Sequence, residues 1–456
     1  MAVTFIGKNA VPNYTCLSTD IVNGTLEKSY INGATVFSLD DGQWYIVKEG
    51  HTLEKYYNPM SNITFSSHQI SLDAGSRLRV GQLRSLGDYK ILNADNTLLW
   101  ENSGDGTGAF SNNTYQLSVA LENEYLISQT KVYHPYFSGK SQLVEMTFDS
   151  FHPVLNVTKR LGYFFSNATA PYDSDFDGFF IESSNGSISF KVYNSGTSIL
   201  DLDISEWSGY SNLWEYKDTD NWENFTVVLF DFLWLGGAIL RLWVKTSHGF
   251  ILAHDFDYSG VQTGTFVLSP NQPIRYEIRS TGGSGELTRI CSQVSTEGST
   301  NEVGITRFVD TGTTYIPANS VSSTYLIKAI RKKVAYRDVA VAIKDIQIGL
   351  GTNEDKAKWI LSINPTFSSS PSFTDVSNSS FQEATGTGAI TLSNLGVIIA
   401  GGIVESGVPV GGKQLEENYM SFLQCLLDNT MEIFCLSVMP FTVNTNVYVG
   451  ISLKQY

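Results

Sequence analysis

Hydrophobic and polar residues alternate along much of the chain with the period of two that is typical of β-strands. In the segment 187–193 the apolar residues share one side of an extended backbone and the polar residues share the other. Asn185-Gly186 directly precedes this segment and supplies the positive φ angles that a two-residue hairpin turn requires. The pattern therefore predicts a hairpin between the strands 178–183 and 187–193.

The segment 225–235 is apolar on both sides, which is typical of a central strand covered on each face. A buried helix would give the same periodicity, but the β-branched and aromatic residues and the following Gly236-Gly237 favour a strand. The runs 239–244 and 250–256 flank a further hairpin turn. Many short strands separated by turns predict a two-sheet sandwich.

Strand-like runs also precede and follow this central region. Near the N-terminus the runs 34–39, 43–48 and 52–57 predict a small β-unit. Beyond Gly298 strand patterns recur, whereas the apolar positions of the segment 415–426 have helical spacing and predict one short helix.

The predicted fold class is all-β, with several β-sandwich domains, a concanavalin/lectin-like or jelly-roll-like centre, and little helix. We predict three domains: an N-terminal β attachment unit at 1–60, a lectin-like β-sandwich at 61–300 and a C-terminal β-domain at 301–456. The predicted boundaries lie at a linker near Asn58-Pro59 and at a change in residue pattern and composition after Gly298.

Charge and composition narrow the classes of partner. The chain of 456 residues has 30 Lys and Arg against 45 Asp and Glu, a net charge of -15 that would repel a nucleic-acid backbone. No segment approaches the roughly 18 uninterrupted apolar residues that span a bilayer, and no secretion signal is recognisable, so we expect no membrane partner and synthesis in a cytoplasm. The cysteines form no CxxC pair, and reduced, mostly buried thiols are expected, with a Cys425–Cys435 link left open.

The usual catalytic motifs are absent from the sequence. Gly139-Lys140-Ser141 resembles the end of a phosphate-binding loop, but His134 stands where the first glycine belongs, so a turn is favoured. The chain has no GxSxG or HExxH motif, and no Glu is followed two residues later by an Asp. We therefore predict no catalytic residue, no cofactor and no enzyme activity, while carboxylates brought together from distant segments remain open.

One acidic segment is a candidate calcium site. Asp173, Asp175, Asp177 and Gly178 match the opening of a calcium loop, in which alternate carboxylates wrap a hard cation. Ser184 occupies the twelfth position, which should be a bidentate Glu, and strands rather than helices flank the segment. A solvated acidic turn is favoured, and these three Asp residues are the candidates if a cation binds.

Two further groups of residues are candidates for binding. His248 and His254 could face each other on a hairpin, but zinc normally takes three or four protein ligands, so surface or core histidines are favoured. Trp207, Trp214 and Trp222 could form a sugar-stacking platform, although core or interface packing is favoured.

The central region resembles a group of structural proteins of tailed bacteriophages, namely head or tail fibre-like virion proteins with a lectin-like β-sandwich. Five stretches in a fixed order carry the resemblance: residues 76–80 (SRLRV), 136–142 (YFSGKSQ), 159–164 (KRLGYF), 230–236 (FDFLWLG) and 270–278 (PNQPIRYEI). The chain departs from these proteins after Trp-Leu-Gly, where it continues with an apolar run that predicts a subunit interface. The resemblance implies no catalytic residues.

What the resemblance implies is a component of the virion, made in the bacterial host cytoplasm. Its partners would be other capsid or tail proteins, further copies of itself, most commonly as a trimer with a dimer next, and a host-surface glycan. Multivalent display would turn weak glycan contacts into firm attachment. Two alternatives remain open: a tailspike-like glycan depolymerase, and a neck or capsid-decorating protein without receptor binding.

Overall fold

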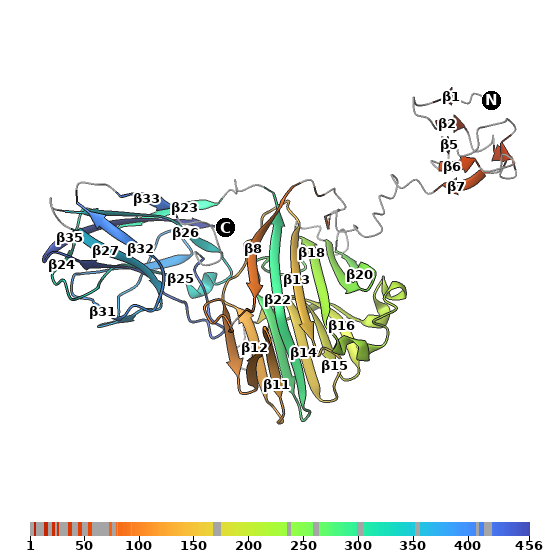
Figure 1. The fold of residues 1–456 in the computed structure, drawn as a ribbon, viewed down its shortest axis with the longest axis horizontal. Coiled ribbons are helices and arrows are strands. Elements are labelled where there is room, and N and C mark those ends of the chain that lie inside the picture. The colour runs from red at the N-terminus through yellow and green to blue at the C-terminus, as the bar shows by residue number, and fades with distance from the viewer. Residues whose placement is uncertain are drawn as a thin grey trace. The chain divides into compact units, whose positions relative to one another are not determined.

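A computed structural model describes most of the chain and divides it into two compact units, Met1–Ser71 and Leu72–Tyr456. The described residues are 73–74, 79, 81–92, 94–166, 175–234, 239–258, 264–298, 304–351, 356–406 and 422–456, together with the backbone of strands β1–β7 and β33. Figure 1 shows the strands of both units. The predicted domain ranges 1–60, 61–300 and 301–456 stay predictions.

The first unit contains a five-stranded sheet in which β2 and β5 pair in parallel and the other neighbours pair antiparallel. The runs predicted at 34–39, 43–48 and 52–57 are confirmed as strands β5, β6 and β7. In sheet order the strands are β1 (Thr4–Phe5), β2 (Asn13–Cys16), β5 (Thr35–Ser38), β6 (Trp44–Val47) and β7 (Leu53–Tyr56), and β3 (Ile21–Val22) pairs with β4 (Thr25–Leu26).

The second unit begins with two antiparallel sheets that enclose a common core, which we call the large sandwich. The seven-stranded sheet runs in the order β17 (Thr197–Asp203), β16 (Ser187–Asn194), β15 (Phe176–Ser184), β14 (Val157–Ser166), β21 (Ile274–Ser280), β12 (Tyr125–Thr130) and β9 (Trp100–Gly104). The eight-stranded sheet runs β10 (Thr107–Ser111), β11 (Thr114–Val119), β22 (Gly285–Glu297), β13 (Gln142–Asp149), β18 (Thr226–Leu233), β19 (Ile239–Thr246) and β20 (Gly249–Asp257), and β8 (Leu83–Lys90) also pairs with β22.

The predicted hairpins of this sandwich are confirmed. β15 and β16 join through Asn185 and Gly186, whose φ angles of 47° and 89° are those of the predicted tight turn. β18 pairs with β13 on one side and β19 on the other, as expected of a central strand, and β19 continues into β20.

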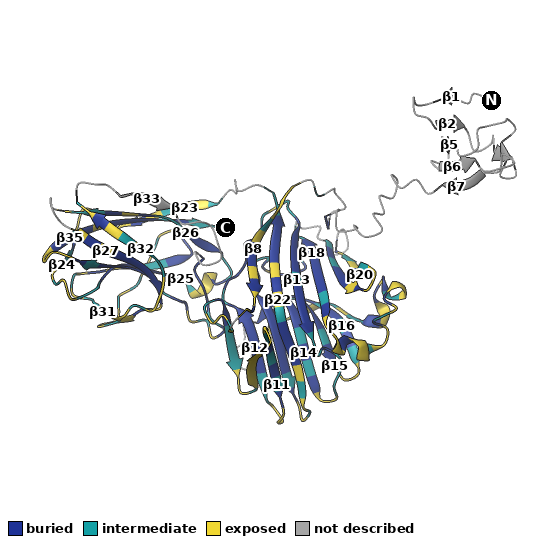
Figure 2. Ribbon diagram, in the orientation of Figure 1, coloured by how far each residue is buried: buried dark blue, intermediate teal, exposed yellow. Residues whose placement is uncertain are grey.

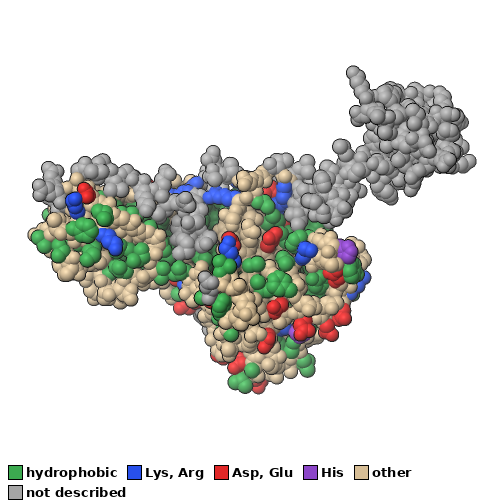
Figure 3. Space-filling model, viewed as in Figure 1, with side chains coloured by type: hydrophobic (Ala, Val, Ile, Leu, Met, Phe, Trp, Pro, Cys, Tyr) green, Lys and Arg blue, Asp and Glu red, His purple; other side chains and the backbone are tan. Residues whose placement is uncertain are grey.

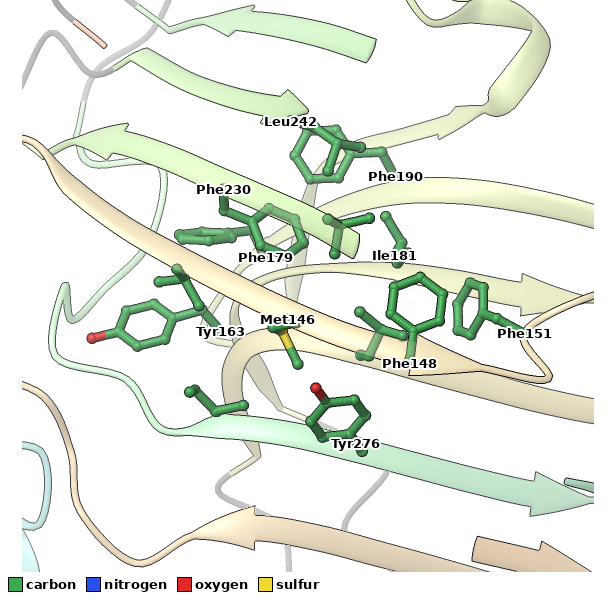
Figure 4. Packing of buried hydrophobic residues seen from close by; sticks show 14 of the residues in the cluster. Met146, Phe148, Phe151, Tyr163, Phe179, Ile181, Phe190, Phe230, Leu242 and Tyr276 are labelled. Carbon is green, nitrogen blue, oxygen red and sulfur yellow. The ribbon is translucent and has the colours of Figure 1, made fainter. Parts of the chain in front are cut away.

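The core of the large sandwich is rich in aromatic side chains. Figure 4 shows rings from both sheets meeting between them, among them those of Phe179 and Phe230, whose centroids lie 5.3 Å apart. Within the seven-stranded sheet, Gly162 lets β14 lie close to β15, because a Cβ there would lie 2.3 Å from the carbonyl oxygen of Phe179. Such cores contribute most of the favourable free energy of folding.

The second unit ends in another pair of sheets, which we call the small sandwich. One sheet runs β23 (Ile305–Asp310), β35 (Thr445–Gln455), β26 (Val341–Leu350) and β33 (Val410–Gln414), with β24 (Ile316–Ala318) also pairing with β35. The other runs β29 (Thr374–Asp375), β30 (Phe381–Thr385), β25 (Tyr325–Lys332), β34 (Phe434–Pro440), β27 (Lys356–Ile363) and β32 (Val397–Glu405), and β28 (Thr366–Phe367) pairs with β31 (Leu392–Asn394).

The all-β class is confirmed, and within the described residues the helical turns are short 3-10 segments. The predicted helix at 415–426 is wrong for Phe422–Leu426, and residues 415–421 lie outside the described residues. Phe422 forms a bridge with Ala342, whereas Cys425 forms one with Met431 and packs against Tyr133. These neighbouring side chains bury against different elements, so tertiary packing overrides the helical spacing.

Two further sequence-based expectations can be compared with the described residues. Cys425 and Cys435 are buried free thiols, so they do not form the disulfide that the sequence left open, and Cys291 is exposed. Among the helices of the described residues, none is long and apolar enough to cross a membrane.

Candidate functional site

The connection between β17 and β18 carries the three tryptophans that the sequence singled out. It folds into three short 3-10 helices: η4 (Ile204–Glu206), η5 (Tyr210–Asn212) and η6 (Thr219–Glu223). The carboxylates of Asp203 and Asp218 accept hydrogen bonds from the backbone at the starts of η4 and η6, which caps both turns.

Two of these tryptophans belong to the core. Trp207 and Trp222 are 2% and 0% exposed, and their ring centroids lie 6.4 Å apart. The indole N–H of Trp222 donates to the carbonyl of Tyr216 at 3.2 Å, so its polar atom is satisfied inside the sandwich. The core-packing interpretation is therefore confirmed for Trp207 and Trp222.

Trp214 is different, because 55% of it is exposed to solvent. Its ring meets the exposed imidazole of His248 in an edge-to-face contact, with centroids 5.4 Å apart and planes at 70°. His248 lies in the turn between β19 and β20, so the fold brings together two candidates that sequence analysis had placed in separate groups.

Hydrogen bonds fix the polar groups beside this ring pair. The carboxylate of Glu215 accepts from the backbone N–H of Ser247 at 2.9 Å and from the hydroxyl of the same residue. The Ser247 hydroxyl, having donated to Glu215, accepts from Nδ1 of His248 at 2.8 Å. This chain places the proton of a neutral His248 ring on Nδ1 and leaves Nε2 as an acceptor. We call Trp214, Glu215, Ser247 and His248 the Trp214 platform.

The electrostatics of the platform follow from these bonds. The hydrogen bonds from Ser247, first from its side chain and then from its backbone, lower the pKa of Glu215 below its usual value. Glu215 therefore stays ionised at neutral pH. The arrangement offers an aromatic surface, a fixed carboxylate and an imidazole acceptor, which suits binding of a polar ligand with an apolar face.

His254 does not join His248 in a shared site. It lies on β20 and is nearly buried, and its Nδ1 accepts from the backbone N–H of Ser208 at 3.1 Å. Its ring packs against Phe190 with centroids 5.9 Å apart, and burial lowers its pKa. The interpretation of His254 as a satisfied core histidine is confirmed.

The three predicted calcium ligands have different surroundings. Asp173 lies outside the described residues, and Asp175 is exposed with φ at 53°. Asp177 is fully buried, and its carboxylate accepts from the backbone N–H groups of Leu268 at 2.7 Å and Ser269 at 2.9 Å, among others. Burial raises the pKa of Asp177, and these hydrogen bonds lower it in part. Asp177 thus anchors a loop, and a calcium role for Asp173, Asp175 and Asp177 stays a prediction.

Among the described residues, no group of three or more His, Cys, Asp or Glu side chains is arranged to hold a metal ion. Gly139-Lys140-Ser141 forms a turn, with φ at 82° for Gly139, which confirms the turn interpretation.

The sequence stretches that carried the phage resemblance meet in the fold, which sequence reasoning did not anticipate. The hydroxyl of Ser141 donates to the buried carboxylate of Asp231 at 2.5 Å, and the guanidinium of Arg79 binds the same carboxylate at 2.6 Å. Gln142, which follows Ser141 in the same stretch, donates to the hydroxyl of Tyr163 in the stretch 159–164 at 2.9 Å. Ser141, Asp231 and Arg79 thus form a buried polar network, and Gln142 and Tyr163 form a separate buried hydrogen bond; both link segments that are distant in the sequence.

Comparisons with solved structures find proteins that are similar over about half of this chain. No family model and no curated protein matches the sequence. Among solved structures, the Emp47p carbohydrate recognition domain is similar at 12% identity and a TM-score of 0.31, covering 48% of this chain and 98% of that domain. The VIP36 exoplasmic/lumenal domain, solved with Ca2+ and Man3GlcNAc, is similar at 11% identity and a TM-score of 0.31, covering 48% of this chain and 92% of that one. An Emp46p carbohydrate recognition domain gives 13% identity and a TM-score of 0.33, covering 47% and 97%.

Proposed function

We propose that the protein is a non-enzymatic, oligomeric component of a bacteriophage virion, a fibre or capsid-associated protein that attaches to a host-surface glycan through the Trp214 platform. The observation that carries the glycan-binding role is the exposed ring of Trp214, held against His248 beside the fixed carboxylate of Glu215. The virion role rests on the ordered sequence stretches described above.

A sugar ring suits the Trp214 platform chemically. Its C–H face packs on an indole, and its hydroxyls reach neighbouring carboxylate and imidazole acceptors. Because hydrogen bonds already hold Glu215, Ser247 and His248, a ligand loses less free energy in ordering these side chains. The energy of one such contact is small, so display of several copies on a particle supplies the avidity.

The net charge of the protein restricts the classes of glycan that we expect it to bind. The net charge is -15, and on the face shown in Figure 3 acidic side chains gather toward the lower edge of the large sandwich. Glu215 adds a negative charge at the platform itself. Like charges repel, so a neutral or cationic glycan is favoured over an acidic polysaccharide.

Glu215 is poorly suited to the general-acid role in glycoside hydrolysis. A glycosidase acid must be protonated at working pH, and its pKa is raised for that purpose. The pKa of Glu215 is lowered instead, because Ser247 stabilises the charged form. Adhesion therefore fits the platform better than depolymerisation does.

Binding of the purified full-length protein to host cells and to immobilised neutral glycans tests the adhesive role. Trp214→Ala should weaken binding roughly tenfold, the loss expected for one aromatic contact. Phe308→Ala is the matched control, since Phe308 is 53% exposed on the small sandwich, and it should bind like the parent protein. Unchanged binding by Trp214→Ala would reject the platform, and release of reducing ends from host polysaccharide would favour the depolymerase.

Electron micrographs of phage particles labelled with an antibody against this chain test the virion role. Labelling at one fixed position on intact particles is the expected result. Particles that carry no label, while the antibody still detects the free protein, would contradict the virion assignment without bearing on glycan binding.

A further inference from the structure

The connection that carries the Trp214 platform is strongly acidic. Residues 204–225 join β17 to β18, and Figure 2 shows their short helical turns, near β16, with both exposed and buried residues. One lysine stands against five acidic residues, which gives this connection a formal charge of -4. A negative field of this kind attracts cations and repels anions. The acidic residues are Glu206, Glu215, Asp218, Asp220 and Glu223.

The hydrogen bonds of Glu215 do not neutralise its charge. Both carboxylate oxygens accept from the backbone N–H of Ser247, at 2.9 and 3.2 Å, and one of them also accepts from the Ser247 hydroxyl. These donors are uncharged, so they stabilise the ionised carboxylate and hold it in place without removing its negative charge.

The two lysines that flank the platform in the sequence make other contacts. Nζ of Lys217 lies 5.0 Å from the centroid of the Tyr210 ring, and Nζ of Lys245 donates to the carbonyl of Thr246 at 2.6 Å. Lys245 is also the weakest of the influences that lower the pKa of Glu215. Neither lysine forms an ion pair with Glu215, so a cation of a ligand can take that place.

The three binding groups of the platform favour the same kind of ligand atom. The exposed indole of Trp214 attracts a cation through its π electrons. The carboxylate of Glu215 attracts a cation and accepts its hydrogen bonds, and Nε2 of a neutral His248 accepts one more. An alkylammonium group supplies a positive charge and three N–H donors, whereas a sugar hydroxyl supplies one donor and no charge.

We propose that the Trp214 platform binds a sugar that carries a free, protonated amino group, in preference to a neutral sugar. This inference rests on the proposed glycan-binding function and adds the chemical group that is recognised. The C–H face of the sugar packs on the indole, and the ammonium group donates to Glu215 and His248. N-acetylation removes the positive charge and two of the three donors, so an N-acetylated sugar should bind like a neutral one.

Ligand-observed NMR titrations of the full-length protein at neutral pH test this preference with the methyl glycosides of glucosamine, N-acetylglucosamine and glucose. The glucosamine glycoside should bind about tenfold more tightly than the other two. Single sugars are used because a polymer of amino sugars would be attracted to any acidic protein. Ethanolamine carries the amino alcohol group without the sugar ring and should bind more weakly than the glucosamine glycoside, and equal affinities would overturn recognition of a sugar.

Two variants locate the charge that is responsible. Glu215→Gln keeps the shape of the side chain but removes its charge, and it should reduce the preference for the amine from about tenfold to about twofold or less. Glu206→Gln is the matched control, because it removes one charge from the same connection, at η4, and it should keep the preference. An equal loss in both variants would trace the preference to the net charge and overturn the proposal.

The response to Trp214→Ala separates this inference from the proposed function. A parent protein that binds all three glycosides equally, and loses them in Trp214→Ala, would overturn the preference for an amine and leave the glycan-binding role of the platform standing. A preference that survives Trp214→Ala, or a parent protein that binds none of the three glycosides, would overturn both.

Discussion

The cores of the two sandwiches of the second unit differ in their content of aromatic side chains. The large sandwich buries Phe, Tyr and Trp between its sheets, whereas the small sandwich has a core built mainly of Val, Ile and Leu. The small sandwich leaves Phe308, Tyr315 and Tyr448 partly exposed. An aromatic residue therefore does not by itself indicate a binding surface in this protein, and its exposure must be known first.

The loop 204–223 repeats this contrast within a few residues and gives the largest expected effect. Trp222 is fully buried against Phe148 and Tyr216, so Trp222→Ala removes a large core side chain and should destabilise the protein by about 3–5 kcal/mol. Trp214→Ala removes a ring that is 55% exposed and should change stability by about 0.5 kcal/mol or less. Urea unfolding of both variants measures the difference, and equal losses would contradict the division into core and platform.

The two sandwiches should also differ in how far their stability falls at acidic pH. His134 in the large sandwich is fully buried, its Nδ1 donates to the carbonyl of Gln272 at 3.0 Å, and burial lowers its pKa to about 4. The unfolded chain binds this proton near pH 6.5, so stability is lost as the pH falls from about 6.5 to about 4, by roughly 3 kcal/mol in total. Residues 304–456 contain no histidine.

Unfolding free energies measured at several pH values should show this loss, and His134→Gln should reduce the slope in that pH window by about one proton. Amide exchange at pH 5 should locate the earlier opening in the large sandwich. A variant with the parent slope would show that another group accounts for the acid sensitivity.

The sequence predicts the local parts of the fold. The alternation of apolar and polar residues, together with the Asn185-Gly186 turn, predicted the β15–β16 hairpin, because such a turn requires positive φ angles at both residues. Long-range contacts decide the rest. The sequence pattern marked Asp177 as a candidate calcium ligand, but it could not show that the Asp177 oxygens accept hydrogen bonds from Leu268 and Ser269, about ninety positions along the chain.

The sequence predicted single residues of the candidate site but not their grouping. Trp214 and His248 were both recognised as binding candidates, yet nothing in the sequence indicates that the turn after η5 and the β19–β20 turn lie together. Trp207 is buried although Glu206 and Ser208 flank it, whereas Trp214 is exposed although Leu213 precedes it, so the packing of the loop on the core, not the neighbouring residues, separates them. The sequence therefore shows which residue types could bind a ligand, and the tertiary structure determines which of them lie together in the Trp214 platform.

The buried ion pair of the large sandwich should give an intermediate effect. Asp231→Asn leaves the guanidinium of Arg79 without its nearer carboxylate, although Glu297 remains 2.7 Å away. Loss of one charged hydrogen-bonded partner of this kind should cost about 2 kcal/mol. Thermal or urea unfolding measures the loss, and a neutral result would mean that the network joining the phage-like stretches contributes little to stability.

The exposed ion pair of the small sandwich should give the smallest effect. Lys356 and Glu405 are 53% and 51% exposed, so solvent screens their attraction, and Glu405→Gln should change the unfolding free energy by about 0.5 kcal/mol or less. Urea unfolding of the variant and of the parent protein measures the change. A loss above about 1 kcal/mol would show that solvent does not screen this ion pair.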